Sequence, residues 1–224
     1  HVPVTPAVPP AQSHAPRLTM VGHASVLIQV AGLNLLTDPV WSTRAGPFGI
    51  TGPKRVTAPG IAFDDLPKID AVLLSHNHYD HLDLATLRRL VRRDAPHMVM
   101  PLGTDVTARK AGRGARLSTA DWHETVALND TVRVTLTRAN HWSSRGLRDR
   151  RMALWAGFWI DTPEGNIWFA GDTGYGTGTI FDEIRTRHGT PDIALIPIGA
   201  YEPRWFMAPQ HIAPDEAVKI FSQI

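Results

Sequence analysis

The segment Ser75-His-Asn-His-Tyr-Asp-His-Leu82 places four potential metal ligands within six residues. It directly follows Ala71-Val-Leu-Leu74, a short apolar run that is typical of a buried strand. Polar groups at such a position need partners, because a buried polar group without one costs free energy. Imidazole nitrogens and carboxylate oxygens are ligands that zinc prefers. The segment therefore predicts a metal site at the end of a strand.

The turn after that strand can aim alternate side chains, His76 and His78, at one metal ion, while Asp80 and His81 face a neighbouring position. A site for a single ion is the main alternative. A polar loop that is rich in histidine by chance is the weaker one.

Two later segments supply further candidate ligands. His141 follows a predicted strand and precedes a polar loop, and Asp172 lies after an apolar strand in Phe169-Ala-Gly-Asp-Thr-Gly174. A lone histidine is often a core or surface residue, and an aspartate between glycines is often a turn residue. Together with the first segment, we predict that both are metal ligands. The carboxylate of Asp172 could bridge two ions.

The composition narrows the class of protein. A chain of 224 residues fits one domain with a real core. The absence of cysteine excludes disulfides, thiolate metal sites and a cysteine nucleophile. A net charge of +2 does not by itself indicate nucleic acid, and no basic patch with interleaved aromatic residues is present, so no nucleic acid partner is expected. No run approaches the ~20 apolar residues of a membrane span, which predicts a soluble or peripheral membrane protein.

The chain divides into an arm and one domain. Residues 1–16 are rich in Pro and Ala and predict an extended, poorly ordered arm, followed by a domain over residues 17–224. Predicted strands cover residues 25–30, 33–37, 71–75, 98–100, 153–160, 166–170 and 193–198, with a strand pair within 125–137. Predicted helices cover residues 83–93, 106–111, 180–188 and 215–222. This mixture of strands and helices, with the candidate ligands at strand ends, indicates an α/β layer fold.

The H-x-H-x-D-H run, the later histidine and the Gly-Asp-Thr-Gly segment resemble the metallo-β-lactamase superfamily. More narrowly, His76–Asp83 and Pro197–Met207 resemble the N-acyl-phosphatidylethanolamine-hydrolysing phospholipase D family. Three shorter segments add to this resemblance: Gly22-His-Ala-Ser25, Thr37-Asp-Pro39 and Gly52-Pro-Lys-Arg55. The resemblance runs from about Thr19 to the end of the chain.

The resemblance implies a four-layer αβ/βα sandwich with two zinc ions at one edge. It places His76, His78 and His141 on one ion and Asp80 and His81 on the other, with Asp172 between them. Asp38 would orient a ligand histidine from outside the metal site. A plain turn residue before Pro39 is an equal alternative for Asp38.

The chain departs from the family in one respect. The family carries the last ligand of the second ion in a His-Trp-Gly segment after the helix that begins near Pro214, and this sequence stops at Ile224. We therefore expect a domain that is incomplete at its C-terminus, lacking its last strand and helix. The first site should be complete and the second weaker. Water, His211 or another segment would fill the remaining position; otherwise His211 lines the pocket.

These residues predict a phosphodiesterase of the phospholipase D type, in which a metal-bound hydroxide attacks an N-acyl-phosphatidylethanolamine-like lipid or another small phosphodiester. Asp80 would accept a proton, and His211 would position substrate or assist the leaving group. Tyr79, Tyr201, Gln210 and His211 are the predicted substrate-binding residues. The alternatives are a lactonase or β-lactamase-type hydrolase at the same metals, and a non-catalytic metal-binding module.

Four further expectations concern redox chemistry, two groups of arginines and the oligomeric state. Relatives that reduce oxygen at two irons carry Glu at the position of His78, which weighs against redox chemistry. Arg88, Arg89, Arg92 and Arg93 form one helix face, which is either solvated or in contact with an anionic membrane surface. Arg145 and the arginines that follow it form a solvated loop or a phosphate clamp. A homo-oligomer is possible.

Overall fold

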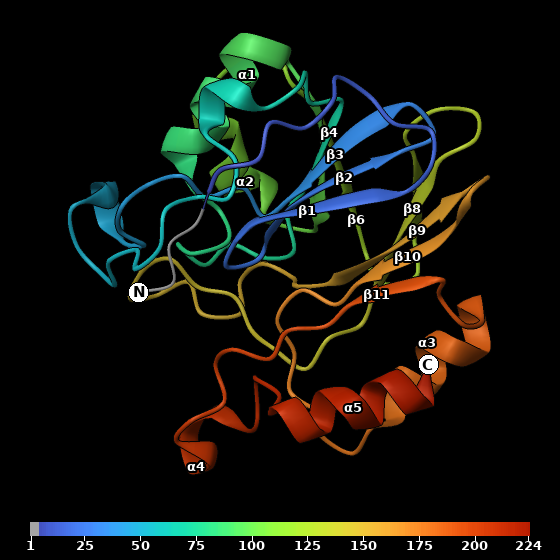
Figure 1. Cartoon of the computed structure of the whole chain (residues 1–224). Helices are drawn as coiled ribbons and strands as arrows, with labels where there is room; N and C mark the ends of the chain where they lie inside the picture. Colours follow the sequence, from blue (N-terminus) through green and yellow to red (C-terminus); the bar gives the residue numbers. More distant parts are fainter. Residues whose placement is uncertain (1–4) are drawn as a thin grey trace.

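The computed structural model describes residues 5–224 and contains two β-sheets packed face to face, with helices on both outer sides (Figure 1). The first sheet has the order β1-β2-β3-β4-β5-β6. Its strands are β1 (Arg17–Gly22), β2 (Ser25–Val30), β3 (Leu33–Thr37), β4 (Ala71–Leu73), β5 (His97–Pro101) and β6 (Arg116–Ala120). The pairs β1/β2 and β2/β3 are antiparallel, whereas β3 to β6 run parallel.

The second sheet has the order β11-β10-β9-β8-β7. Its strands are β7 (Thr125–Ala127), β8 (Arg133–Thr137), β9 (Gly157–Thr162), β10 (Gly165–Phe169) and β11 (Ile193–Leu195). Strands β7 to β10 pair antiparallel, and β11 joins β10 in parallel. Within residues 5–224, β11 is the outermost strand of this sheet. The predicted loss of a further strand and helix stays a prediction.

The helices form the two outer layers. Helices α1 (Leu84–Asp94) and α2 (Asp105–Ala108) lie on the first sheet, whereas α3 (Thr179–His188) and α5 (Pro214–Gln223) lie on the second (Figure 1). A short helix, α4 (Arg204–Met207), precedes α5, and 3-10 turns cover Pro47–Gly49, Phe63–Asp65 and Arg109–Ala111. None of the helices within residues 5–224 is both long and apolar enough to cross a bilayer.

Three apolar layers hold the sandwich together. Leu87 and Leu90 of α1 pack on the first sheet, Phe158 lies between the sheets, and Trp168 and Phe181 pack outside the second sheet. All five side chains are completely or almost completely buried. Burial of each contributes about 1.5–3 kcal/mol or more, which makes these layers the main stabilising term. The four-layer αβ/βα sandwich is confirmed.

Some strand boundaries differ from the sequence prediction. Strand β9 begins at Gly157, because the preceding segment is bound to the first sheet instead: Leu154 N donates to Leu102 O and Ala156 N donates to Ser75 O. Strand β11 already ends at Leu195. Strands β1 and β6 were not predicted. Both are edge strands, and their pairing with β2 and β5 supplies what their weak sequence pattern lacks.

The N-terminal arm is extended, as predicted, but residues 5–16 are bound to the domain. The side chain of Gln29 donates to Pro10 O, and that of Asn34 donates to Ala11 O. Ala31 N also donates to His14 O. Two buried amide side chains thus use the arm as a hydrogen-bond acceptor, and the expectation of poor order stays a prediction. Residues 1–4 of the predicted arm lie outside the described part.

Candidate metal centre

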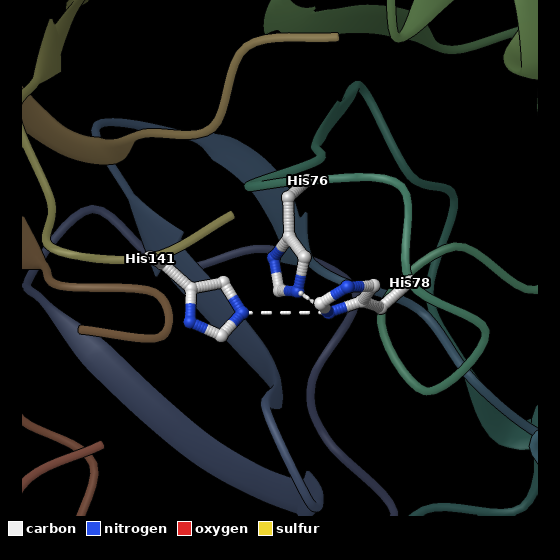
Figure 2. Close-up of side chains that lie close together, drawn as sticks. All are labelled: His76, His78 and His141. Carbon is white, nitrogen blue, oxygen red and sulfur yellow. Dashed lines mark hydrogen bonds between the residues drawn. The ribbon is translucent and has the colours of Figure 1, made fainter. Parts of the chain in front are cut away.

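The loops that follow β4, β8 and β10 bring the predicted ligands together at one edge of the sandwich. His76 and His78 come from the first loop and His141 from the second, and their rings point toward one another (Figure 2). His76 Nε2 lies 2.8 Å from His78 Nδ1, and His141 Nε2 lies 3.4 Å from the same atom. We call His76, His78 and His141 the three-histidine group. Its ligand atoms all lie within 4.8 Å of one another.

Asp172 occupies the centre of the cluster. Its Oδ2 atom lies 3.2 Å from His81 Nε2, 3.8 Å from His141 Nε2 and 3.8 Å from His211 Nδ1. The same carboxylate thus faces residues from both predicted sites. This is the position that a bridging ligand needs.

A glycine before Asp172 permits this placement. Gly171 has φ +62°, and a Cβ atom there would lie 3.0 Å from both Ala156 O and Ser75 Cβ. A side chain at position 171 would therefore be strained by both backbone and space. The Gly-Asp-Thr-Gly segment is a tight strand end that packs against the loop carrying His76.

The second group consists of His23, Asp80 and His81, which we call the Asp80 group. His23 Nε2 lies 3.0 Å from Asp80 Oδ2, and His81 Nε2 lies 3.8 Å from that oxygen. Asp80 and His81 were predicted as ligands of one ion. The sequence prediction assigned no role to His23, although its Gly22-His-Ala-Ser25 segment carried part of the family resemblance.

Asp38, which directly follows β3, contacts both Ser75 and His81. It is completely buried, its Oδ2 lies 2.8 Å from His81 Nδ1, and Ser75 donates to it from both N (2.7 Å) and Oγ (2.5 Å). Ser75 Oγ also lies 2.9 Å from His76 Nδ1. These contacts direct His81 Nε2 toward Asp172, as expected for a carboxylate that orients a ligand histidine.

The predicted substrate-binding residues have different places. Gln210 contacts the three-histidine group rather than open space: its carbonyl oxygen lies 3.1 Å from His141 Nδ1, and its side chain accepts from Trp142 Nε1. His211 lies beside Asp172, in a group of candidate ligands that also contains His141. Tyr201 makes no side-chain hydrogen bond to the centre within the described residues. A substrate contact for these residues stays a prediction.

Tyr79 and Arg145 support the ligand loop. Arg145 donates to the carbonyl oxygens of Asn77 and Leu82, and its guanidinium lies 3.9 Å from the centre of the Tyr79 ring. Tyr79 donates in turn to Arg145 O. Arg145 is therefore not part of a solvated loop. Burial lowers its pKa, and its donors are used to hold the backbone of the metal-binding segment.

The electrostatic surroundings keep the three-histidine group neutral. Burial lowers the pKa of His78 to about 4 and that of His141 to about 3, and it lowers the pKa of His76 as well. Removing an imidazolium from water is costly, and the neighbouring histidines add repulsion. At neutral pH these rings are uncharged and keep a lone pair for a metal ion.

The other ligands form a set of compensating charges. Burial disfavours the charged form of His81, but the carboxylates of Asp172, Asp80 and Asp38 outweigh it and raise the pKa of His81 well above its usual value. Burial would likewise raise the pKa of Asp172 and of Asp80. The charge of His81 outweighs it, and both pKa values lie below their usual range. Removal of the His81 proton would leave a strongly anionic pocket suited to a cation.

The residues of this cluster fit divalent metal ions. His81 Nε2 is buried and faces the centre, where it lies 3.2 Å from the Asp172 carboxylate. Three neutral imidazole nitrogens also face one another at hydrogen-bond distance. Nitrogen and carboxylate donors without thiolates suit zinc and other first-row ions.

A cavity of about 570 Å³ opens beside the cluster. Its walls include His23, Asp80 and Trp142 on the metal side and Lys54, Arg55 and Val56 on the opposite loop. This volume lies in the range of small-molecule sites. The Gly52-Pro-Lys-Arg55 segment thus meets the metal ligands across one cavity.

The comparisons with known proteins agree with this fold and site. A model described as "Beta-lactamase superfamily domain" matches residues 33–224, and the chain belongs to this family. Among solved structures, the chain is similar to that of CmlA, a diiron β-hydroxylase from Streptomyces venezuelae. That structure has a TM-score of 0.60 and 25% identity, and the match covers 95% of this chain and 40% of CmlA.

Two curated relatives are more similar in sequence. N-acyl-phosphatidylethanolamine-hydrolyzing phospholipase D 1 of Caenorhabditis elegans is 38% identical over 90% of this chain and 59% of its own length. The mitochondrial enzyme of the same name from Saccharomyces cerevisiae is 36% identical over 92% of this chain and 44% of its own length. The chain thus spans about half the length of these relatives.

Proposed function

We propose that this protein is a zinc-dependent phosphodiesterase of the phospholipase D type, acting on N-acyl-phosphatidylethanolamine-like lipids. The observation that carries the proposal is the 36–38% identity to two relatives of that name, which extends over at least 90% of this chain. The geometry adds a metal-ligand cluster beside a cavity with cationic residues on its far wall. Water would cleave the diester into an N-acylethanolamine and a phosphatidic acid.

The residues that would hold the first ion are His76, His78, His141 and Asp172, and those for the second include Asp80, His81 and Asp172. When bound, such ions act as Lewis acids and lower the pKa of water from 15.7 to roughly 7. Zinc is proposed because the donors are imidazole and carboxylate. The diiron neighbour makes direct measurement of the metal necessary.

The proton-handling roles follow from the local charges. The pKa of Asp80 lies below its usual range, which makes this carboxylate a weak base and suits it to hold a cation. Burial lowers the pKa of His211, so its imidazole is neutral at pH 7. His211 can therefore accept a hydrogen bond or a proton from a water molecule or the substrate, after which the imidazolium could pass that proton to the departing group.

The cationic loop opposite the metals suits a phosphate-containing substrate. Lys54 is exposed and lines the cavity, whereas Arg55 donates to Val40 O and Ser42 O and thereby holds the loop in place. Lys54 is thus the cation available to a phosphate oxygen. Phe48 (95% exposed) and Ile50 on the same loop are suited to peripheral contact with a lipid surface.

The test compares four substrates on one preparation: an N-acyl phosphatidylethanolamine, a bis-aryl phosphodiester, a lactone and a chromogenic β-lactam. We expect hydrolysis of both diesters, loss of activity after chelation and its return with Zn²⁺. Turnover of the lactam or lactone without either diester would replace the proposed function by the corresponding hydrolase. Turnover of none, by protein with bound metal, would favour a non-catalytic metal-binding module.

A further inference from the structure

His23 lies close to Asp80 and His81, the two predicted ligands of the second ion. Its Nε2 atom is 3.0 Å from Asp80 Oδ2, its ring centre is 5.0 Å from that of His81, and the ligand atoms of all three residues lie within 4.8 Å of one another. Ligand atoms of one metal ion have separations of this size, because zinc binds nitrogen and oxygen at about 2.0–2.2 Å.

The backbone around His23 is distorted in a way that aims the ring at the centre. The pairing of β1 with β2 shifts register between Met20 and Gly22, and Gly22 has φ +146°. His23 itself adopts φ +51°, a conformation that is uncommon for residues other than glycine. Such bulges often redirect a side chain next to a functional site.

The turn that carries His23 is anchored to the segment that orients His81. Ser25 Oγ donates to Asp38 O at 2.5 Å and accepts from Val40 N at 3.1 Å. Thr37 Oγ1 donates to Ala24 O at 2.8 Å. The hairpin between β1 and β2 is therefore held in a fixed relation to Asp38, which itself contacts His81.

An ordinary surface ion pair does not account for this arrangement. The side chains of His23 and Asp80 are 49% and 43% exposed, and pairs with that exposure add little to stability. A strained residue persists where the surroundings determine its conformation, and such residues cluster at functional sites. A metal ion bound by both residues would explain the positive φ of His23 and its short contact with Asp80.

We propose that His23 is a protein ligand of the second metal ion, together with Asp80, His81 and Asp172, so that these residues offer it two nitrogens and two carboxylates. The inference rests on the proposed function, because it assumes that the centre holds two ions. It gives the Gly22-His-Ala-Ser25 segment a chemical role: Gly22 permits the bulge, His23 binds and Ser25 anchors the turn.

The test measures metal binding by the 224-residue protein, without use of activity. Metal-free protein is titrated with Zn²⁺ against a chromophoric chelator, for the wild type, His23→Ala and the control His14→Ala in the exposed N-terminal arm. We expect two ions bound by the wild type and by His14→Ala. His23→Ala should bind the first ion with unchanged affinity and the second at least tenfold more weakly.

A second measurement uses the wild type alone and does not depend on folding of the variant. In a ¹⁵N spectrum of the histidine rings, the Nε2 resonance of His23 should shift with the second equivalent of Zn²⁺ and not with the first. If the wild type binds two ions while the His23 resonance stays unchanged and His23→Ala binds both normally, this inference fails and the proposed function stands. If the wild type binds no metal, the proposed function itself fails.

Discussion

The two halves of the metal centre differ in exposure and in charge. In the three-histidine group, His76 and His141 are buried and the pKa of each ring is lowered, so the ligands are neutral before any ion arrives. In the Asp80 group, the Asp80 side chain is 43% exposed and the buried His81 carries a raised pKa. The first half is ready for a cation, whereas the second must release a proton to bind one.

This difference in exposure and charge explains how one centre can bind two ions with different affinities. Neutral ligands that are already in place release no proton and lose little hydration when a metal ion binds. The Asp80 group exchanges a proton for the ion and remains open to solvent at the cavity. We therefore expect the ion at the three-histidine group to be the more tightly bound. The following changes test this contrast, from the largest effect to the smallest.

Loss of the Asp172 carboxylate should weaken both ions and so remove the difference in affinity between the two groups. Asp172→Ala removes the one oxygen that faces both groups, so both ions should be weakened by more than the ~10–100-fold that loss of an outer partner of a ligand costs. Metal content by mass spectrometry and diester hydrolysis should both fall strongly. Asp130→Ala, in the exposed turn between β7 and β8, is the matched control. Full metal content in Asp172→Ala would refute the bridging role.

A change at Asp38 should affect the affinity for the second ion more than the affinity for the first. Asp38→Asn keeps the shape of the side chain but removes the charge beside His81 Nδ1. We expect affinity for the second ion to fall ~10–100-fold and affinity for the first to change much less. Competitive titration with Zn²⁺ measures both values, and thermal unfolding of the metal-free protein checks that the variant folds. Equal losses at both ions would show that Asp38 acts on the whole centre.

The occupancy of the two ions should respond differently to pH. The pKa of His81 is raised, so its competing proton is bound at every pH below that raised value, and affinity for the second ion should fall as pH falls. The expected slope is about tenfold per unit, since one proton leaves for each ion bound. His78 and His141, with pKa values of about 4 and about 3, have no such competition between pH 8 and 5.

Dialysis of the loaded protein at a series of pH values, followed by metal analysis, measures this order of release. The second ion should leave first as the pH is lowered from 8 to 5. Simultaneous release of both ions over that range would contradict the electrostatic difference between the groups.

The smallest effect is expected at Ser75, whose hydroxyl touches both halves. Ser75 Oγ donates to Asp38 and lies 2.9 Å from His76 Nδ1. Ser75→Ala removes one hydrogen bond from the His76 side and one from the Asp38 side, each worth about 0.5–1.5 kcal/mol, so the affinity for each ion should fall by roughly tenfold or less. Zinc titration of this variant beside Asp38→Asn provides the measurement. A loss larger than that of Asp38→Asn would mean that the hydroxyl, rather than the carboxylate, holds the ligands in place.

Much of the centre was predictable because its ligands are close in the sequence or directly follow apolar strands. The run from His76 to His81, with the strand Ala71–Leu73 before it, indicates a metal site from spacing alone. His141 and Asp172 were found by the same pattern, since each lies just beyond a strand of recognisable periodicity. The αβ/βα sandwich followed from the resemblance of these segments to a known family.

His23 shows what local pattern could not supply. It lies more than fifty residues before the H-x-H-x-D-H run, in a hairpin whose sequence contains no second ligand, and its approach to Asp80 depends on a bulge in β1. Gln210 is a similar case, because its contacts with His141 and Trp142 join residues about seventy positions apart and no local pattern indicates them. The sequence favoured a site in both regions without indicating which neighbour each residue meets.

What the sequence determined by itself is the set of candidate ligands and the class of fold, because strand periodicity and ligand spacing are local properties of the chain. The tertiary structure alone decided how charge is divided between the two groups of ligands. That division arises from the burial of His76 and His141 and from three carboxylates around His81. These carboxylates belong to Asp38, Asp80 and Asp172, which lie in segments that follow three different strands. Burial and distance between residues far apart in the chain exist only after the sheets have packed, and they set the pKa values on which metal binding depends.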